Sequence, residues 1–362
     1  MNFLTALLVL CPQSAQAPLL HHTFAAGVEG WSILQLTGSG AKVSTTSEAA
    51  NVRPGSAALK VEYDVAQGQT SFAVLPAPPQ MAKMQSLKFW IKADQATTMA
   101  LSIQEREGGR FSTVLSVPKG AWQPVEIGLG DLMLGVGQGD PKDANGKLDL
   151  DKLEMLSLGD FQQFIAQNAD FASIAGVQNG ARAFYLSDFQ ISAAALPDTT
   201  TSGAEFRFDT YARPQIAWAS LGGPELKIVA DGRVTGKALR ASYRTLPGKL
   251  MALVRVVRAG SLTGKTVAKL QIASAKPAKL LIQLEETTGG KYNAILDIKG
   301  GSTSNDYDYL LSALIPSDDS KDDNGKLDVD KVHQLVLIDV TSLFESAEQD
   351  NVIWLGSIVA KS

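Results

Sequence analysis

Residues 140–160 read DPKDANGKLDLDKLEMLSLGD, and residues 319–339 read DSKDDNGKLDVDKVHQLVLID. The two segments are identical at 13 of 21 positions, where unrelated sequences would agree at about one or two. Two further matches lie upstream, SAALKVEY (56–63) with GKALRASY (236–243) and LSIQEREGGRF (101–111) with IQLEETTGGKY (282–292). The offsets of the three matches are 179, 180 and 181 residues, so the chain contains two copies of one domain.

The junction between the copies has the composition of a linker. A strand-like segment, FYLSDFQIS (184–192), is followed by AAALPDTTTSGA (193–204), which is rich in small residues, Thr, Pro and Gly. We predict a first domain at residues 18–196, a flexible linker at 197–204 and a second domain at 205–362. The copies differ mainly near their C-terminal ends, where the first carries an insertion of about ten residues, in FQQFIAQNADFASIAGVQNGARA.

The local pattern within each copy is that of β-strands. Short alternating runs such as LKFWIKA (87–93), KLLIQLE (279–285) and YNAILDI (292–298) are bounded by Gly, Pro, Asn or Asp. The pairs Gly108–Gly109 and Gly289–Gly290 separate two such runs in each copy and predict hairpin turns. Many short strands in units of about 160 to 180 residues predict an all-β protein of two tandem antiparallel β-sandwiches.

Composition excludes several functional classes. The chain has 362 residues, 45% of them hydrophobic, with 33 basic and 37 acidic side chains and a net charge of −4. A mildly acidic chain without Lys/Arg clusters lacks the electrostatic pattern of a nucleic-acid binder. Three His and one Cys leave little room for a His-rich metal site or for thiol chemistry. No GxSxG, HExxH, P-loop or strand-following GxGxxG motif is present, and Glu105 and Glu286 have no identifiable catalytic partner.

The N-terminus has the features of an export signal. Its apolar run, Phe3 to Cys11, is too short to span a bilayer and is followed by Ala15-Gln16-Ala17. We expect a signal peptide at residues 1–17, a secreted or periplasmic protein, and no membrane span. The alternative of lipid attachment at Cys11 is disfavoured by Leu10, because lipoprotein signals need a small residue there.

The order of the segments GWSIL, SAALKVEY, LKFWIKA, LSIQEREGGRF, GAWQPVEIGL, DANGKLDLDKL and YLSDFQI resembles that of galactose-binding-like jelly-roll domains. The resemblance is to family 11 type carbohydrate-binding modules and to complex I intermediate-associated protein type domains. It covers essentially all of the first domain and less of the second. Such domains are typically non-catalytic, bind glycans on a sheet face or at edge loops and commonly hold a structural calcium, although others bind only proteins.

The Asp-rich loops supply oxygen ligands of the kind that Ca²⁺ prefers. An EF-hand arrangement fails in both copies, because with Gly146 or Gly325 at the sixth position, the first and twelfth positions carry no carboxylate. Two interpretations remain: a turn anchored by Leu148 with Asp149 or Asp151 capping a helical turn, or calcium in another geometry. The candidate metal ligands are Asp140, Asp143, Asn145, Asp149, Asp188, Asp319, Asp322, Asn324 and Asp328.

The resemblance implies a calcium site elsewhere, between acidic residues near the first strand and an Asp in the last one. The first copy has Asp188 in its last strand but no acidic residue directly after Phe24. The second has Glu205 and Asp209 near its start, but Ser357 in place of the closing Asp. We therefore expect that neither domain binds calcium tightly and that no cofactor is required.

A ligand surface is predicted from strand alternation. If Leu101 and Ile103 face the core, the opposite face of that strand is polar, and the second copy adds the tyrosines of NDYDY. The candidate ligand-binding residues are Gln104, Arg106, Arg110, Gln283, Glu285, Tyr292, Tyr307 and Tyr309. Core or edge packing is expected for Trp31, Trp90, Trp122 and Trp354, whereas Trp218 has no evident packing role.

These features predict an exported, non-catalytic protein that binds a polysaccharide or surface glycan through two homologous modules. The alternative is a structural or protein-interaction module of the cell envelope, with envelope proteins as partners and no sugar binding.

Overall fold

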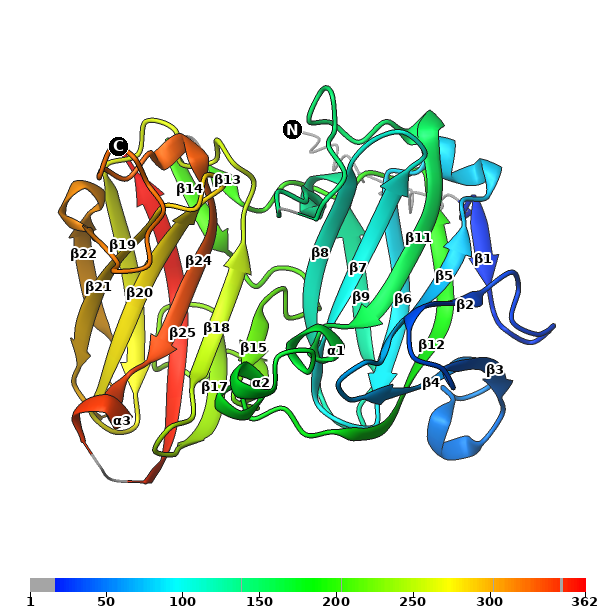
Figure 1. Ribbon diagram of the computed structural model, residues 1–362, viewed down its shortest axis with the longest axis horizontal. Helices are drawn as coiled ribbons and strands as arrows, with labels where there is room; N and C mark the ends of the chain where they lie inside the picture. The colour runs from blue at the N-terminus through cyan, green and yellow to red at the C-terminus, as the bar shows by residue number, and fades with distance from the viewer. Residues whose placement is uncertain (1–16, 138, 203, 302, 346–347) are drawn as a thin grey trace, which may run out of the picture.

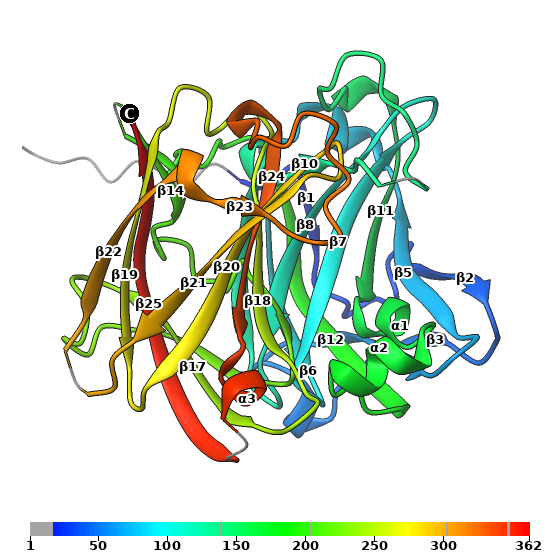
Figure 2. The ribbon, with the colours of Figure 1, turned by 60° about the vertical axis from the view of Figure 1, so that its left-hand side comes forward.

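The computed structural model describes residues 17–137, 139–202, 204–301, 303–345 and 348–362. It contains four antiparallel sheets, arranged as two sandwiches that lie side by side (Figures 1 and 2). The predicted all-β class with two tandem antiparallel sandwiches is therefore confirmed. The predicted signal peptide lies, except for its last residue, outside the described residues. No described helix is both long and apolar enough to cross a bilayer.

The first sandwich consists of two six-stranded sheets. Sheet 1 has the order β3-β4-β12-β6-β9, with β1 also on β12: β3 (Lys42–Thr46), β4 (Ala58–Val65), β12 (Gly180–Ser192), β6 (Ser86–Ala93), β9 (Gln123–Gly128) and β1 (Leu20–His22). Sheet 2 has the order β10 (Met133–Leu134), β8 (Arg110–Val117), β7 (Thr97–Glu105), β11 (Leu153–Asp160), β5 (Thr70–Pro76) and β2 (Ser32–Thr37).

The second sandwich repeats this plan. Sheet 3 has the order β13 (Thr201–Ser202), β14 (Glu205–Asp209), β25 (Gln349–Lys361), β17 (Ala238–Thr245) and β16 (Glu225–Val229), with β19 (Val267–Ser274) on β25 and β22 (Asn305–Leu310) on β19. Sheet 4 has the order β15 (Ala219–Leu221), β18 (Met251–Val256), β24 (Val332–Asp339), β20 (Ala278–Glu286), β21 (Lys291–Ile298) and β23 (Ile315–Pro316).

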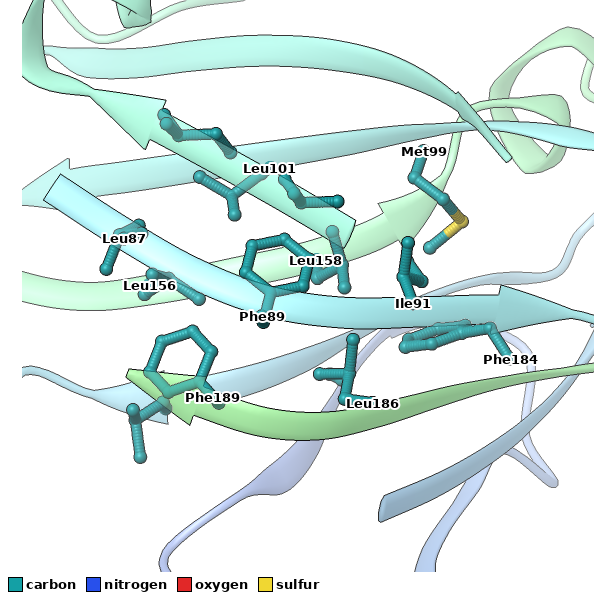
Figure 3. Close-up of a cluster of buried hydrophobic side chains, with 14 of the residues drawn as sticks. Leu87, Phe89, Ile91, Met99, Leu101, Leu156, Leu158, Phe184, Leu186 and Phe189 are labelled. Carbon is teal, nitrogen blue, oxygen red and sulfur yellow. The ribbon is translucent and has the colours of Figure 1, made fainter. Parts of the chain in front are cut away.

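Alternation along the strands builds a separate core in each sandwich. In β7, Leu101 and Ile103 are buried, as predicted. Leu101 lies in one apolar cluster with Leu156 and Leu158 of the neighbouring strand β11 and with the aromatic side chains of β6 and β12 (Figure 3). In β20 every second residue is buried, from Ala278 to Glu286. The predicted hairpins at Gly108–Gly109 and Gly289–Gly290 join β7 to β8 and β20 to β21. Trp218 is completely buried in the second core, which supplies the packing role that its sequence context did not reveal.

The insertion of the first copy forms most of one contact between the sandwiches. The segment that carries it, residues 161–183, contains α1 (Gln162–Ile165) and α2 (Ala169–Ile174), whereas the described residues of the second copy contain only α3 (Thr341–Phe344), at the place of α1. Backbone N–H groups of Leu250 and Gly222 donate to the carbonyls of Ile174 and Ala175, each at 3.0 Å. Leu221 of the second sandwich packs against a small apolar cluster of the insertion.

A second contact joins the edge of sheet 2 to the start of the second sandwich. The Ser116 N–H donates to the Ile216 carbonyl at 2.9 Å, and the Ser116 hydroxyl donates to the Trp218 carbonyl at 2.7 Å. Gln215 exchanges two hydrogen bonds with the Glu126 backbone. In the segment predicted as a linker, the Pro197 carbonyl accepts a hydrogen bond from Arg213, and Thr201–Ser202 pairs with β14. The sandwiches are therefore held by direct hydrogen bonds as well as by the chain.

Candidate functional site

The Asp-rich loop of the first copy closes on a buried glutamate. Glu105, at the end of β7, is 1% exposed and accepts a hydrogen bond from the Asp149 N–H. Asp143 accepts the N–H groups of Asn145 and Gly146 within the loop and that of Gly109 in the hairpin. Burial raises the pKa of the Glu105 carboxyl, with the backbone hydrogen bond from Asp149 opposing it. These hydrogen bonds therefore hold the loop that precedes β11 against the β7–β8 hairpin.

The second copy repeats this arrangement. Glu286 is 2% exposed and accepts the Asp328 N–H at 2.6 Å. Asp322 accepts the Tyr292 hydroxyl and the Lys326 N–H, and Asn324 donates to Asp328 at 3.1 Å. Burial, together with the Asp322 carboxylate, raises the pKa of Tyr292, so its hydroxyl stays protonated and donates.

The predicted capping role of the loop aspartates is wrong. Neither Asp149 nor Asp328 makes a side-chain cap hydrogen bond; Asp149 accepts Asn145 and Lys152 instead, and Asp328 accepts Asn324 and Lys331. The anchor at Leu148 is confirmed, and Leu153 and Leu156, which follow the turn, pack into the same core. Asp140 accepts the Gly137 N–H, and Asp319 accepts Lys291 and the Ser317 hydroxyl. Among the described residues, no group of three or more His, Cys, Asp or Glu side chains is arranged to hold a metal ion.

Arginine side chains lie beside two of the acidic residues, Asp188 and Asp209, from which the resemblance implies a calcium site. Arg255 donates to the carbonyls of Phe208 (2.8 Å) and Ala217 (2.6 Å), and its Nε lies 3.8 Å from the Asp209 carboxylate. In the first copy, Asp188 pairs with Arg53, and His21 Nε2 lies 3.5 Å from it. A guanidinium already satisfies oxygen atoms that would otherwise face a cation.

We therefore predict that calcium binding has little effect on the stability of the protein. Adding millimolar Ca²⁺ to EDTA-treated protein is expected to change Tm by less than about 2 °C, measured by differential scanning fluorimetry. A rise of many degrees would contradict this prediction and favour a calcium site in the Asp-rich loops. The variant Asp143→Asn would then locate the site, because it should abolish the rise.

The ligand residues predicted in the first copy are engaged in their own hairpin. Gln104 donates to the carbonyls of Glu105, Gly108 and Gly109, and its Oε1 lies 3.4 Å from Arg110 Nε. Arg106 donates to the Asp151 carbonyl at 3.0 Å. Arg110 also lies 3.5 Å from Asp140. These side chains stabilise the turn and the Asp-rich loop.

The ligand residues predicted in the second copy are dispersed. Gln283 and Glu285 lie on the outer face of sheet 4, where Glu285 accepts the Gln334 amide. Tyr292 is 1% exposed, so it presents no surface to a ligand, contrary to the prediction. Tyr307 and Tyr309 pack against the second core, and the Tyr307 hydroxyl donates to the Asp297 carbonyl at 2.8 Å.

Tryptophan rings are also largely covered. Trp31 and Trp218 are buried, and their Nε1 groups donate to His22 and Asp209. The guanidinium of Arg53 lies 3.9 Å from the ring centroid of Trp90, and that of Arg233 lies 4.3 Å from Trp354. Among the described residues, the large exposed aromatic side chains are those of Phe161, Phe164, Phe171 and Phe344. Three of these four lie on the insertion.

Two of the grooves that the described residues form along the junction of the sandwiches meet each other. The first has a volume of about 660 Å³ and is lined by polar residues of both copies, among them Gln95, Gln162, Gln178, Asn179 and Ser220. The second has a volume of about 630 Å³ and is lined by Gln67, Ser173, Arg244, Thr245 and Lys249. The grooves meet at residues 176–179 and at Gly222, which line both. Uncharged amides and hydroxyls dominate the polar lining of the first groove.

Sequence reasoning missed Gln162, Gln178 and Asn179, although a signal was present. All three lie in the segment 161–183, which carries the insertion of the first copy. Insertions in one repeat commonly form loops on a binding face, so the asymmetry of the repeat could have directed attention to them. Strand alternation could not have identified these three residues, because they lie outside the strands.

Comparisons with known proteins give structural similarity only. No protein-family model and no curated protein sequence matches the chain. A family 11 carbohydrate-binding module from Clostridium thermocellum, solved with a β-1,3-1,4-mixed-linked tetrasaccharide, is 19% identical, with 49% of this chain and 96% of that chain covered and a TM-score of 0.36. The CBM22-1–CBM22-2 tandem domain of Paenibacillus barcinonensis Xyn10C is 14% identical over 97% of this chain and all of that chain, with a TM-score of 0.31. Both of these similar structures are carbohydrate-binding modules. Neither these identities nor these TM-scores assign a ligand to this chain.

Proposed function

We propose that this protein is an exported, non-catalytic carbohydrate-binding protein that holds a glycan in the two grooves between its sandwiches. The observation that carries the proposal is the amide- and hydroxyl-rich lining of two grooves that meet at Gln178 and Asn179. An amide side chain donates and accepts hydrogen bonds, which matches the hydroxyl groups of a sugar. Each groove falls in the size range of ordinary ligand sites, and because the two meet, one extended oligosaccharide can occupy both.

The exposed phenylalanines of the insertion support the same ligand class. Phe161 and Phe164 flank the groove residue Gln162 in sequence, and their ring centroids lie 6.0 Å apart. Phe164 also contacts Phe72 of β5, with 5.7 Å between ring centroids. Aromatic faces pack well against the apolar C–H surfaces of sugars, and these rings are among the few that are not covered.

The acidic residues of the grooves support a non-catalytic role. A glycosidase needs two carboxyl groups that face each other across the bound sugar. The acidic residues of the lining are Glu225, which pairs with Lys227 at 2.6 Å, and Asp339, which is 3% exposed and accepts the Tyr243 hydroxyl. The equivalent pair Glu105 and Glu286 is buried beneath the Asp-rich loops. No second carboxyl group is therefore available to Glu225 or Asp339 as a partner within the described lining.

Replacing Gln178 and Asn179 together with alanine is expected to weaken glycan binding about tenfold. Each lost hydrogen bond to a sugar hydroxyl costs about 0.5–1.5 kcal/mol, and two such losses approach one to two powers of ten in Kd. Both side chains are exposed, so stability should change by less than about 0.5 kcal/mol. The measurement is affinity electrophoresis in gels that contain plant, algal or microbial polysaccharides.

The matched control is Gln283→Ala, an amide on the outer face of sheet 4, and it should bind as the wild type does. If Gln283→Ala loses binding and the Gln178→Ala/Asn179→Ala variant retains it, the glycan site lies on the outer face of sheet 4 and not in the grooves. Absence of binding to every polysaccharide would refute the proposed function.

A second candidate, a protein-interaction module of the cell envelope, is favoured by the same exposed side chains. Phe161, Phe164, Phe171 and Ile174 are each 37–41% exposed on the insertion. Clustered exposed apolar residues are typical of interaction surfaces. A protein that binds no polysaccharide and is retained on an envelope fraction, with retention lost in Phe164→Ser, would favour this candidate.

A further inference from the structure

The two grooves are basic although the chain is acidic. Their lining contains five cationic side chains, Lys119, Arg182, Lys227, Arg244 and Lys249, and only two anionic ones, Glu225 and Asp339. The whole chain, in contrast, has a net charge of −4. The excess of positive charge is therefore confined to the grooves at the junction, and the net charge of the whole chain does not reveal it.

Three of these cations are already paired. Arg182 lies 3.4 Å from the buried Asp160, Lys227 lies 2.6 Å from Glu225, and Arg244 lies 2.9 Å from Glu348. In each pair the carboxylate neutralises the cation, so these three side chains attract an anionic ligand only weakly.

Lys119 and Lys249 differ from the other three, since no carboxylate of the described residues forms a salt bridge with either. Lys119 is exposed at the first groove. Lys249 lines the second groove, and its Nζ donates to the Ser173 carbonyl at 2.6 Å. The same Nζ also lies 3.4 Å from the Ser173 hydroxyl oxygen, and because an ammonium group has three donors, Lys249 retains one for a ligand. One uncompensated ammonium group thus lies in each groove, with the amides of Gln178 and Asn179 where the grooves meet.

We propose that the ligand of these grooves is an acidic polysaccharide, whose carboxylate or sulfate ester groups pair with Lys119 and Lys249. This inference rests on the proposed function and specifies its substrate class. The amides bind the hydroxyl groups of sugars along the chain, and the two ammonium groups select chains that carry negative charge in both grooves. Because both cations are accessible to solvent, binding depends on ionic strength.

The test compares charged and neutral polymers at two salt concentrations. The wild-type protein is run in gels containing polygalacturonate, a sulfated galactan, neutral agarose or a neutral mixed-linked glucan, at 50 and at 300 mM NaCl. We expect retardation by at least one of the two acidic polymers, weaker retardation by neutral polymers, and about a tenfold loss of affinity at the higher salt concentration. Whether polygalacturonate or the sulfated galactan binds decides between carboxylate and sulfate ester.

The double variant Lys119→Gln/Lys249→Gln is expected to bind the acidic polymer about tenfold more weakly and to lose most of the salt dependence. The matched control is Lys299→Gln, an exposed lysine directly after β21 in the second sandwich, and it should bind as the wild type does. The single variant Lys119→Gln, which removes no hydrogen bond between the sandwiches, should account for part of the loss, and a Tm within 2 °C of wild type should accompany it.

Two results would overturn the inference and leave the proposed function standing: equal, salt-independent binding of neutral and acidic polymers, or unchanged binding in the double variant. Equal binding of duplex DNA would also overturn it, because it would indicate general attraction of polyanions. Absence of binding to all four polymers would instead refute the proposed function itself.

Discussion

Replacing Asp160 with alanine is expected to lower the free energy of unfolding of the first sandwich by about 3–5 kcal/mol. Asp160 ends β11 and is completely buried. Its carboxyl group accepts the hydroxyls of Tyr63 (2.8 Å) and Thr97 and the Gln162 N–H (2.8 Å), and Arg182 lies 3.4 Å away. Removing the carboxyl group leaves a buried guanidinium and two buried hydroxyls without their common partner, which accounts for the size of the loss.

Urea denaturation followed by tryptophan fluorescence measures this loss. Asp64→Ala is the control, because Asp64 lies on β4 next to Tyr63 but is exposed, and its replacement should change stability by less than about 0.5 kcal/mol. Losses of similar size in the two variants would show that the network around Asp160 contributes little.

The second copy preserves the centre of this network without its cation. Asp339 is 3% exposed and accepts the Tyr243 hydroxyl and the Thr341 N–H. Asn351 occupies the position opposite Tyr243 that Arg182 occupies opposite Tyr63. The Asp and Tyr residues are both identical in the matched segments of the repeat, so sequence identity between the copies here marks a buried pair and not a ligand site.

The fold was predictable because its signals are repeated and local. Strand alternation places Leu101 and Ile103 inward, Gly-Gly pairs place the hairpins, and the duplication provides each observation twice. The same reasoning failed for the site, because a polar side chain on an outer strand face is not necessarily free. Gln104 illustrates the failure: it satisfies three carbonyls of its own hairpin, and no periodicity reveals such bonds.

The grooves were beyond prediction for a different reason. They are made between the copies, from loops whose approach depends on hydrogen bonds between distant segments such as Ile174 and Leu250. Ser220 and Gln162 meet in one groove although 58 residues separate them in sequence. Duplication identifies the units, but their relative position depends on the insertion, which has no counterpart in the second copy.

The junction provides the second large expected effect, in Gly222→Ala. Gly222 has a φ of +79°, and a Cβ atom there would lie 2.0 Å from the Leu250 carbonyl oxygen. Because the backbone fixes the Cβ position and the atoms that it meets are backbone atoms, no rotamer change relieves the clash, and we expect a loss of about 3 kcal/mol in stability. The Gly222 and Leu250 segments donate the two backbone hydrogen bonds to the insertion, so moving them apart should open both grooves and weaken glycan binding at least tenfold.

Gly223→Ala separates the effect of the clash from that of backbone strain. Gly223 also has a positive φ, +64°, but a Cβ atom there would meet open space, so its replacement should cost only about 1 kcal/mol and leave binding unchanged. Near-UV circular dichroism tests whether both sandwiches remain folded, and faster proteolysis within residues 193–204 reports a loosened junction. If Gly222→Ala is folded, loosened and still binds as well as Gly223→Ala, the glycan does not occupy the grooves, because a site made by two sandwiches cannot survive their separation.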